Sequence, residues 1–171
     1  MEIRVGVLTI STRGSRGERP DESGPTIESL VRERVGARIA QAQMLPDSQP
    51  DIQAVLAQWA DGGSIDLILT TGGTGFAPSD VTPEATRRVI DREAPGLAEA
   101  MRAASLKVTP HAMLSRGVAG IRGRTLIVNL PGSPKAVREG LEVILPVLPH
   151  AIALLRETPG EDERHAPETA R

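Results

Sequence analysis

The sequence predicts an α/β protein, a three-layer αβα sandwich around a mostly parallel sheet, and two observations carry this prediction. Short apolar runs rich in β-branched residues alternate with segments of helical periodicity along most of the 171-residue chain. The clearest of these runs have no polar face, which is typical of parallel strands buried on both sides. Strands that alternate with helices imply parallel pairing, with helices on both faces of the sheet.

The individual elements follow from apolar spacing and from turn residues, taken in chain order. The run Val5–Ile10 predicts the first strand. Ser23 as N-cap and Pro25 in the first turn predict a helix that ends at Gly36. The remaining expected elements are a strand over 38–45, a helix from Ser48 or Pro50 to Gly62-Gly63, a strand over 66–71, a helix from Pro83, a helix over 95–107, strands over 118–121 and 125–130 paired through Arg122-Gly123, and one or two closing helices that end near Arg156.

Length and composition set the domain count and exclude several kinds of site. One domain is expected over residues 1–156, and the charged, aperiodic residues 157–171 predict a disordered tail. A net charge of −2, with one Phe, one Trp and no Tyr, argues against a nucleic-acid partner. The absence of Cys excludes disulfides, thiolate zinc sites and cysteine nucleophiles. No signal peptide or membrane span is visible, so we expect no membrane partner and a cytoplasmic location.

Four predicted loops follow strands and are rich in Gly, Pro, Ser, Thr and Asp. They begin at Ser11, at Pro46, at Gly72 and at Pro131. In an open parallel sheet, ligands bind where the carboxyl ends of the strands meet, so these loops are expected to converge on one site.

The glycine-rich loop Thr71-Gly72-Gly73-Thr74-Gly75 comes directly after a buried strand. Its glycines let backbone N–H groups turn inward, and such a nest with two threonine hydroxyls favours an anion such as phosphate. The loop is neither a Walker loop nor a dinucleotide fingerprint, because the required Lys and the third Gly are missing. The glycines alone are equally compatible with a tight strand-to-helix turn that has no ligand.

Two carboxylates accompany this loop. About ten residues of irregular chain separate this strand from the next helix, which exceeds the usual connection of about 4–6 residues. Asp80 lies near the end of this loop and Asp47 follows the second strand. As oxygen ligands they would suit Mg²⁺ in phosphoryl or nucleotidyl transfer, although helix entry and turn formation would also explain them. Three histidines lack partners at metal-ligand spacing and are interpreted as surface or cap residues: His111, His150 and His165.

The stretch Leu69–Pro78, followed by Asp80–Thr86, resembles the signature of the molybdopterin-binding family. That family includes bacterial MogA and MoaB and the G domains of gephyrin and its plant counterpart. Further matching stretches are Arg92–Gly96, Met113–Arg116, Gly120–Gly123 and Asn129–Ser133, and the similarity runs from Val5 to about Arg156. The resemblance therefore implies a MogA/MoaB-like fold.

It also implies an activity, molybdopterin adenylyltransferase. In that reaction the terminal phosphate of molybdopterin attacks the α-phosphate of Mg-ATP, and pyrophosphate leaves. By matching positions, Asp47 and Asp80 are the catalytic and magnesium-binding residues. The substrate-binding positions are Ser11, Thr71, Gly72, Gly73, Thr74, Gly75, Ser115, Arg116, Pro131, Gly132 and Ser133. Relatives are typically homotrimers, and a separate downstream protein inserts the metal into the product.

Two positions depart from the pattern of many relatives. Thr12 stands where the first loop often has Asp, and Ser79 stands where a basic residue often precedes the aspartate. Neither change removes a predicted carboxylate. A non-catalytic, pterin-binding MoaB-type paralogue stays open as an alternative. A scaffold role like that of gephyrin would need further domains or a long linker, so we do not expect it.

Overall fold

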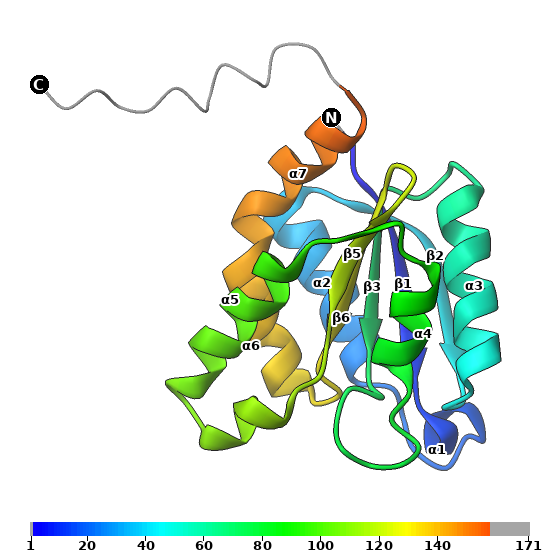
Figure 1. The fold of residues 1–171 in the computed structure, drawn as a ribbon, viewed down its shortest axis with the longest axis vertical. Coiled ribbons are helices and arrows are strands. Elements are labelled where there is room, and N and C mark those ends of the chain that lie inside the picture. The colour runs from blue at the N-terminus through cyan, green and yellow to red at the C-terminus, as the bar shows by residue number, and fades with distance from the viewer. Residues whose placement is uncertain (1, 158–171) are drawn as a thin grey trace, which may run out of the picture.

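The computed structural model describes residues 2–157, which form a six-stranded sheet between two layers of helices (Figure 1). The strands are β1 (Arg4–Ile10), β2 (Arg38–Leu45), β3 (Leu67–Thr71), β4 (Arg92–Glu93), β5 (Ala119–Arg122) and β6 (Thr125–Leu130). The α-helices are α1 (Thr12–Ser15), α2 (Ser23–Val35), α3 (Gln49–Asp61), α4 (Thr82–Val89), α5 (Pro95–Leu106), α6 (Pro134–Ile144) and α7 (Leu148–Leu155). Two 3₁₀ turns, η1 (Pro110–Leu114) and η2 (Leu145–Val147), complete the set.

The sheet has the order β2-β1-β3-β6-β5-β4. Strands β2, β1, β3 and β6 are parallel, whereas β5 pairs antiparallel with β6 and the edge strand β4 pairs antiparallel with β5. The predicted αβα sandwich with a mostly parallel sheet is therefore confirmed. The expected hairpin also forms, since β5 pairs antiparallel with β6 across a turn in which Gly123 has φ 54°.

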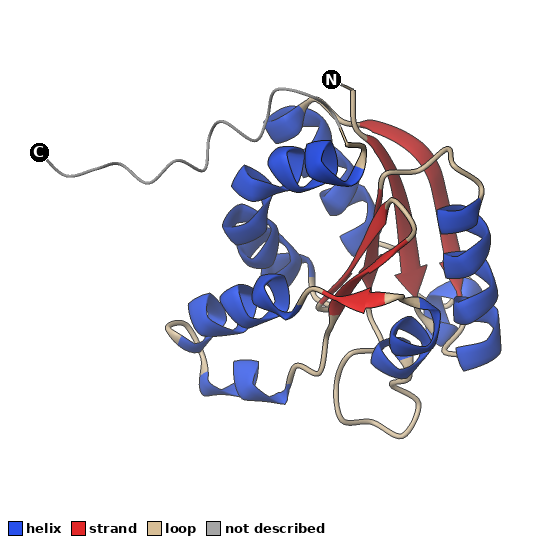
Figure 2. Cartoon of the chain, turned by 45° about the horizontal axis from the view of Figure 1, so that its top comes forward, coloured by secondary structure: helices blue, strands red, loops and turns tan. Residues whose placement is uncertain are grey.

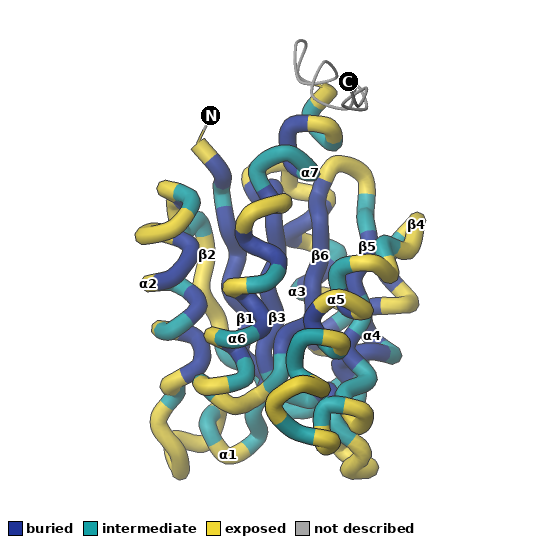
Figure 3. Tube along the Cα trace, turned by 90° about the vertical axis from the view of Figure 1, so that its left-hand side faces the viewer, coloured by how far each residue is buried: buried dark blue, intermediate teal, exposed yellow. Residues whose placement is uncertain are grey.

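Alternate residues of the central strands face the two helical layers. On one face, residues such as Val5, Leu67 and Val128 pack against α2, α5, α6 and α7. On the other, Leu8, Ile68 and Ile127 pack against α3 and α4. Figure 2 shows helices on both sides of the sheet, and Figure 3 shows that β1, β3 and β6 are buried while the edge strand β2 is more exposed. Burial on both faces explains why the sequences of the central strands are nearly continuous apolar runs.

Four short elements were not expected from the sequence: α1, β4, η1 and η2. β4 has two exposed charged residues, so no apolar pattern marks it. The N-cap of α2 is Glu22, not Ser23 as predicted. The Ser23 hydroxyl donates instead to the carbonyl oxygen of Gly132 at 2.7 Å, a partner 109 residues away. A tertiary hydrogen bond therefore replaces the expected local cap.

The strand order places a topological switch between β1 and β3. The chain leaves β1 for β2 on one side, and later returns through β3 on the other side of β1. A crevice at the carboxyl ends of two such strands is where ligands bind in open α/β sheets. α1 and the loop after β3 lie at this end of the molecule (Figure 1). The fold thus brings the predicted loops to one edge.

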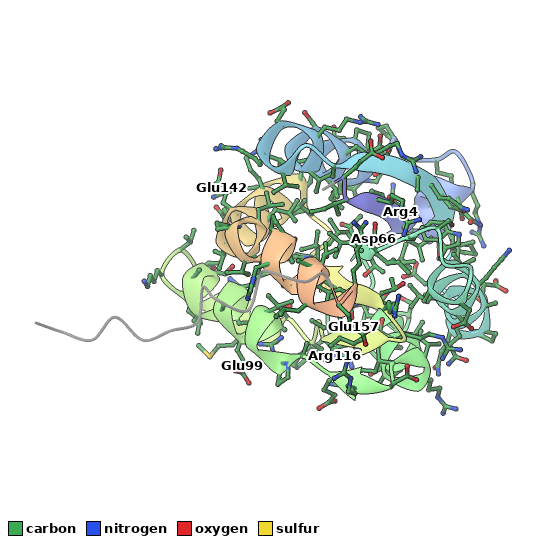
Figure 4. All side chains as sticks on the ribbon, turned by 90° about the horizontal axis from the view of Figure 1, so that it is seen from above. Arg4, Asp66, Glu99, Arg116, Glu142 and Glu157 are labelled. Atoms are coloured by element: carbon green, nitrogen blue, oxygen red, sulfur yellow. The ribbon has the colours of Figure 1, made fainter. Side chains whose placement is uncertain are left out.

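An ion cluster around a buried carboxylate lies at the opposite end of the sheet. Asp66 is 3% exposed, and its carboxylate accepts hydrogen bonds from Arg4 Nη2 at 2.8 Å and Arg156 Nε at 2.9 Å. Figure 4 shows Arg4 and Asp66 beside each other. Burial opposes ionisation, but the hydrogen bonds from the two arginines outweigh it and hold the pKa of Asp66 well below its usual range. The cluster ties the beginnings of β1 and β3 to the end of α7.

Two sequence predictions concern residues that the structure does not describe. The predicted tail, 157–171, lies outside the described residues except for Glu157, and His165 lies outside them as well. The boundary after residue 156 therefore stays a prediction. Among residues 2–157, every helix is too short or too polar to span a lipid bilayer.

Candidate functional site

The predicted loop after β3 begins with two glycines in a conformation that other residues rarely adopt. Gly72 and Gly73 have φ values of 95° and 66°, a left-handed conformation that disfavours other residues. Thr82, at the start of α4, fixes both: its hydroxyl donates to Gly72 O at 2.9 Å and its N–H to Gly73 O at 3.1 Å. Within residues 2–157, the N–H groups of Gly73, Thr74 and Gly75 donate to no protein acceptor. They are therefore available to a ligand.

Replacing Gly72 by alanine is expected to destabilise the protein by about 3 kcal/mol. A Cβ atom there would overlap the carbonyl oxygen of Ile10, in addition to the cost of the positive φ. Urea unfolding measures the loss as a lower midpoint at unchanged slope. Gly96→Ala in α5 is the matched control, because its Cβ meets no atom within 4 Å. Equal stability of the two variants would contradict the assigned geometry.

Asp47 lies beside this loop, after the end of β2. Its Oδ2 accepts hydrogen bonds from the Thr12 hydroxyl at 2.7 Å and from the Thr12 N–H at 3.0 Å. Its Oδ1 lies 3.3 Å from the position that a Cβ on Gly73 would take. One carboxylate oxygen is thus held by the protein, and the other lies against the glycine-rich loop.

Asp80 belongs to the same loop and lies near its C-terminal end. Its Oδ2 accepts the Ala77 N–H at 2.9 Å and lies 2.8 Å from the position of a Cβ on Gly75. Its carboxylate therefore turns back over the loop that leads to it. Asp47 and Asp80 lie next to glycines two positions apart, so the structure brings the two predicted carboxylates to one segment.

The donor set fits magnesium. Among residues 2–157, no group of three or more His, Asp or Glu side chains could hold a metal ion. Mg²⁺ is commonly bound by one or two carboxylates, with water and substrate phosphates completing its coordination. Asp47 and Asp80 each have a second carboxylate oxygen that accepts no hydrogen bond within the described part of the chain. These two residues would hold the ion, and the metal role of both stays a prediction.

Arg116 spans the glycine-rich loop. Its Nε donates to Gly75 O at 2.7 Å, its Nη2 donates to Asp80 O at 2.8 Å, and its guanidinium forms an ion pair with Glu84. The hydrogen bond from Arg116 lowers the pKa of the Glu84 carboxyl, and Glu84 in turn raises the pKa of Arg116. The sequence predicts a ligand contact for Arg116, which stays a prediction. The structure gives it a second role, which is to hold the loop that carries Asp80.

Replacing Arg116 by lysine is expected to lower turnover by about 10-fold. Lysine keeps the charge but cannot hold Gly75, Asp80 and Glu84 together, because it lacks the planar fork of the guanidinium. Steady-state rates of the reaction that the resemblance implies, followed as release of pyrophosphate, measure the effect. The control is Arg88→Lys on α4, since Arg88 is exposed. An unchanged rate for Arg116→Lys, or the same loss in both variants, would contradict this role.

Two cavities flank the segment after β6. The first, of about 310 Å³, is lined by predicted residues Ser11, Thr71, Gly72, Gly132 and Ser133. The second, of about 230 Å³, is lined by predicted residues Ser115 and Pro131. The remaining predicted residues line neither cavity: Asp47, Gly73, Thr74, Gly75, Asp80 and Arg116. The predicted site is thus a glycine-rich loop with two carboxylates, next to a pair of cavities.

The segment Pro131–Ser133 is tied firmly between these cavities. Thr71 donates its hydroxyl hydrogen to Pro131 O at 2.6 Å, and Ser23 donates to Gly132 O at 2.7 Å. The Ser133 hydroxyl accepts the Ala136 N–H at 3.2 Å as the N-cap of α6. Three hydroxyls therefore fix this segment beside the glycine-rich loop.

Several lining residues were not identified from the sequence. Asp21 lines the first cavity, where it accepts a hydrogen bond from Thr9 at 2.8 Å. Arg102 lines the second and donates to Gly117 O at 2.8 Å. Asn129 also lines it, 2% exposed, with its amide donating to Thr70 at 3.0 Å. Of these three residues, only Asn129 could have been identified from the sequence, because it is the one amide in an otherwise apolar run, Leu126–Leu130.

Comparisons with known proteins all indicate one family. Residues 6–150 match the family described as "Probable molybdopterin binding domain". The chain is 46% identical over 164 residues to gephyrin of Dictyostelium discoideum, covering 91% of this chain but only 23% of that protein. It is 42% identical over 154 residues to molybdopterin adenylyltransferase of Helicobacter pylori, covering 90% and 88% of the two chains. The solved structure of the molybdopterin biosynthesis enzyme MoaB from Thermus thermophilus is similar, with a TM-score of 0.86, 56% identity, and coverage of 92% and 98%.

Proposed function

The chain belongs to the family of molybdopterin-binding domains, and we propose that it adenylylates molybdopterin with Mg-ATP. The observation that carries this proposal is the pair of carboxylates, Asp47 and Asp80, against a glycine-rich loop with free N–H groups. Such a loop binds phosphate, and carboxylates beside bound phosphates suit a magnesium nucleotide. The relative from Helicobacter pylori that covers most of this chain bears the name of this activity.

The reaction is a nucleotidyl transfer. An oxygen of the terminal phosphate of molybdopterin attacks the α-phosphorus of ATP and forms a new P–O bond. The bond from the α-phosphorus to the oxygen that bridges to the β-phosphate breaks, and its electron pair leaves with pyrophosphate. Mg²⁺, when bound, would offset negative charge on the phosphate oxygens.

The residues of the chain contribute mainly by binding and positioning. The N–H groups of Gly73, Thr74 and Gly75 would donate to phosphate oxygens, and the free oxygens of Asp47 and Asp80 would hold the ion. Donors fixed in advance by backbone hydrogen bonds need no reorganisation when charge develops.

The two cavities beside the Pro131–Ser133 segment are proposed to receive the two substrates, one on each side. Their lining includes all predicted substrate-binding residues other than Arg116 and the three glycine-loop residues Gly73, Thr74 and Gly75. A segment fixed by three hydroxyl hydrogen bonds would keep the substrates in a constant relative position.

Further parts of the proposal rest on the resemblance of the sequence to its family. They are a homotrimeric assembly, a cytoplasmic location, and delivery of the product to a downstream metal-insertion protein. Sedimentation equilibrium of the purified chain tests the first of these, with three times the monomer mass as the expected result.

Pyrophosphate release tests the proposed function. We expect release to require ATP, molybdopterin and Mg²⁺ together, and to stop when EDTA removes the ion. Titration calorimetry with molybdopterin provides the second measurement. Molybdopterin binding without pyrophosphate release would contradict the proposed enzyme and support a non-catalytic pterin-binding protein instead.

A further inference from the structure

Thr12 joins the loop after β1 to the loop after β2 through one side chain. Its hydroxyl donates to Asp47 Oδ2 at 2.7 Å and accepts the Asp47 N–H at 3.1 Å. Its own N–H donates to the same Oδ2 at 3.0 Å. The hydroxyl is therefore used as donor and acceptor at once, by two groups of the same aspartate.

The position of Thr12 is itself fixed by the short helix α1. Ser11 N–H donates to Leu45 O at 2.8 Å, and the Ser11 hydroxyl accepts the Gly14 N–H at 3.0 Å as the N-cap of α1. Ser15 donates its hydroxyl hydrogen to Thr12 O at 2.9 Å. Hydrogen bonds therefore hold the backbone on both sides of Thr12, and this fixes its side chain relative to Asp47.

These contacts determine which oxygen of Asp47 is free. With Oδ2 held by two donors, rotation of the carboxylate would break both hydrogen bonds. Oδ1 accepts no hydrogen bond from residues 2–157 and lies beside Gly73, in the loop whose N–H groups are free. A threonine, unlike an acidic residue, supplies this donor without adding a charge that would repel Asp47.

We propose that Thr12 is a positioning residue, which keeps Asp47 Oδ1 directed at the glycine-rich loop and thereby sets the affinity of the site for a divalent cation with its nucleotide. The inference rests on the proposed function, because it assumes that Asp47 is a ligand of that cation. It assigns no chemical step to Thr12, which acts only through Asp47. Outer partners that orient a metal ligand commonly change metal affinity by about 10–100-fold when they are removed.

The test compares Thr12→Val with Thr12→Ser. Valine keeps the branched shape and the N–H donor but removes the hydroxyl, whereas serine keeps the hydroxyl. Binding of Mn²⁺ with α,β-methylene ATP, a nucleotide that cannot be cleaved at the reacting bond, is measured by electron paramagnetic resonance. We expect the Kd to rise about 10-fold in Thr12→Val and to stay near the wild-type value in Thr12→Ser.

The Mg²⁺ dependence of turnover gives an independent test of the role of Thr12. In Thr12→Val, the Mg²⁺ concentration for half-maximal pyrophosphate release should rise by a similar factor, with most of kcat recovered at saturating Mg²⁺. Thr26→Val is the matched control. Thr26 lies on α2, and its hydroxyl also donates to an oxygen, Glu22 O at 2.7 Å, but not to Asp47. Its Kd and kcat should not change. Thr12→Ala replaces Thr12→Val if the latter does not fold.

Two results would overturn the inference: wild-type Mn²⁺ affinity in Thr12→Val, or an equal loss in Thr12→Ser. The proposed function fails separately, through absence of molybdopterin-dependent pyrophosphate release in the wild-type protein. The Mn²⁺ titration needs no turnover, so the two failures are distinguishable.

Discussion

Asp80→Asn is expected to lower the rate of molybdopterin adenylylation by about 10²–10³-fold, while binding of molybdopterin stays measurable. Asparagine keeps an oxygen that can accept the Ala77 N–H, so the loop retains its shape. It removes the negative charge that would hold Mg²⁺ beside the phosphates. Single-turnover product formation at saturating substrate separates the loss in chemistry from any loss in binding.

The matched control for this substitution is Asp91→Asn. Asp91 also accepts a backbone N–H, from Gly123 at 2.7 Å, but it lies near the β5–β6 turn and lines neither cavity. We expect it to retain wild-type activity. Equal activity of Asp80→Asn and the wild-type protein would contradict the role assigned to Asp80.

Asp66→Asn is expected to lower the free energy of unfolding by about 3–5 kcal/mol, because it leaves Arg4 and Arg156 facing a neutral partner at a buried position. The substitution lies at the end of the sheet opposite the site, so activity below the unfolding transition should not change. Asp61→Asn removes an exposed partner of Arg122 and should lower the free energy of unfolding much less. Urea denaturation of the three proteins measures both effects.

The same cluster predicts a pH dependence with a defined sign. The pKa of Asp66 is lower in the folded protein than the unfolded value of about 3.9, so its stabilisation is fully present above that value. It is lost as the pH falls from about 4 toward the folded pKa. The difference in unfolding free energy between wild type and Asp66→Asn should therefore shrink below pH 4. A difference that stays constant down to pH 2 would contradict the assignment.

Most of the fold could be predicted because it is encoded in local patterns. The runs Val5–Ile10 and Thr125–Leu130 are mostly apolar, and each becomes a buried strand. Gly36 ends α2 with φ 62°, as a helix-terminating glycine should. The short β4 could not be predicted, because its two residues are charged and exposed and only pairing with β5 makes them a strand.

The candidate site was predictable only in part, for a similar reason. The glycine-rich loop and its two aspartates follow strands, so the sequence and the rule for strand ends indicate them. Their contacts join segments far apart in the chain: Thr12 with Asp47, and Arg116 with Glu84. No local pattern encodes such pairs, since they depend on how the sheet brings loops together. The same holds for the ion pair of the buried Asp66 with Arg156.

The central claim is that this site transfers the adenylyl group of ATP to molybdopterin, and isotope-labelled ATP tests it most directly. With ATP labelled at the α-phosphorus, the account predicts that the label appears in the molybdopterin product and that the pyrophosphate is unlabelled. With ATP labelled at the γ-phosphorus, the label should leave entirely in pyrophosphate. Transfer of the γ-label to molybdopterin, or release of the α-label as free AMP whether or not molybdopterin is present, would contradict the account.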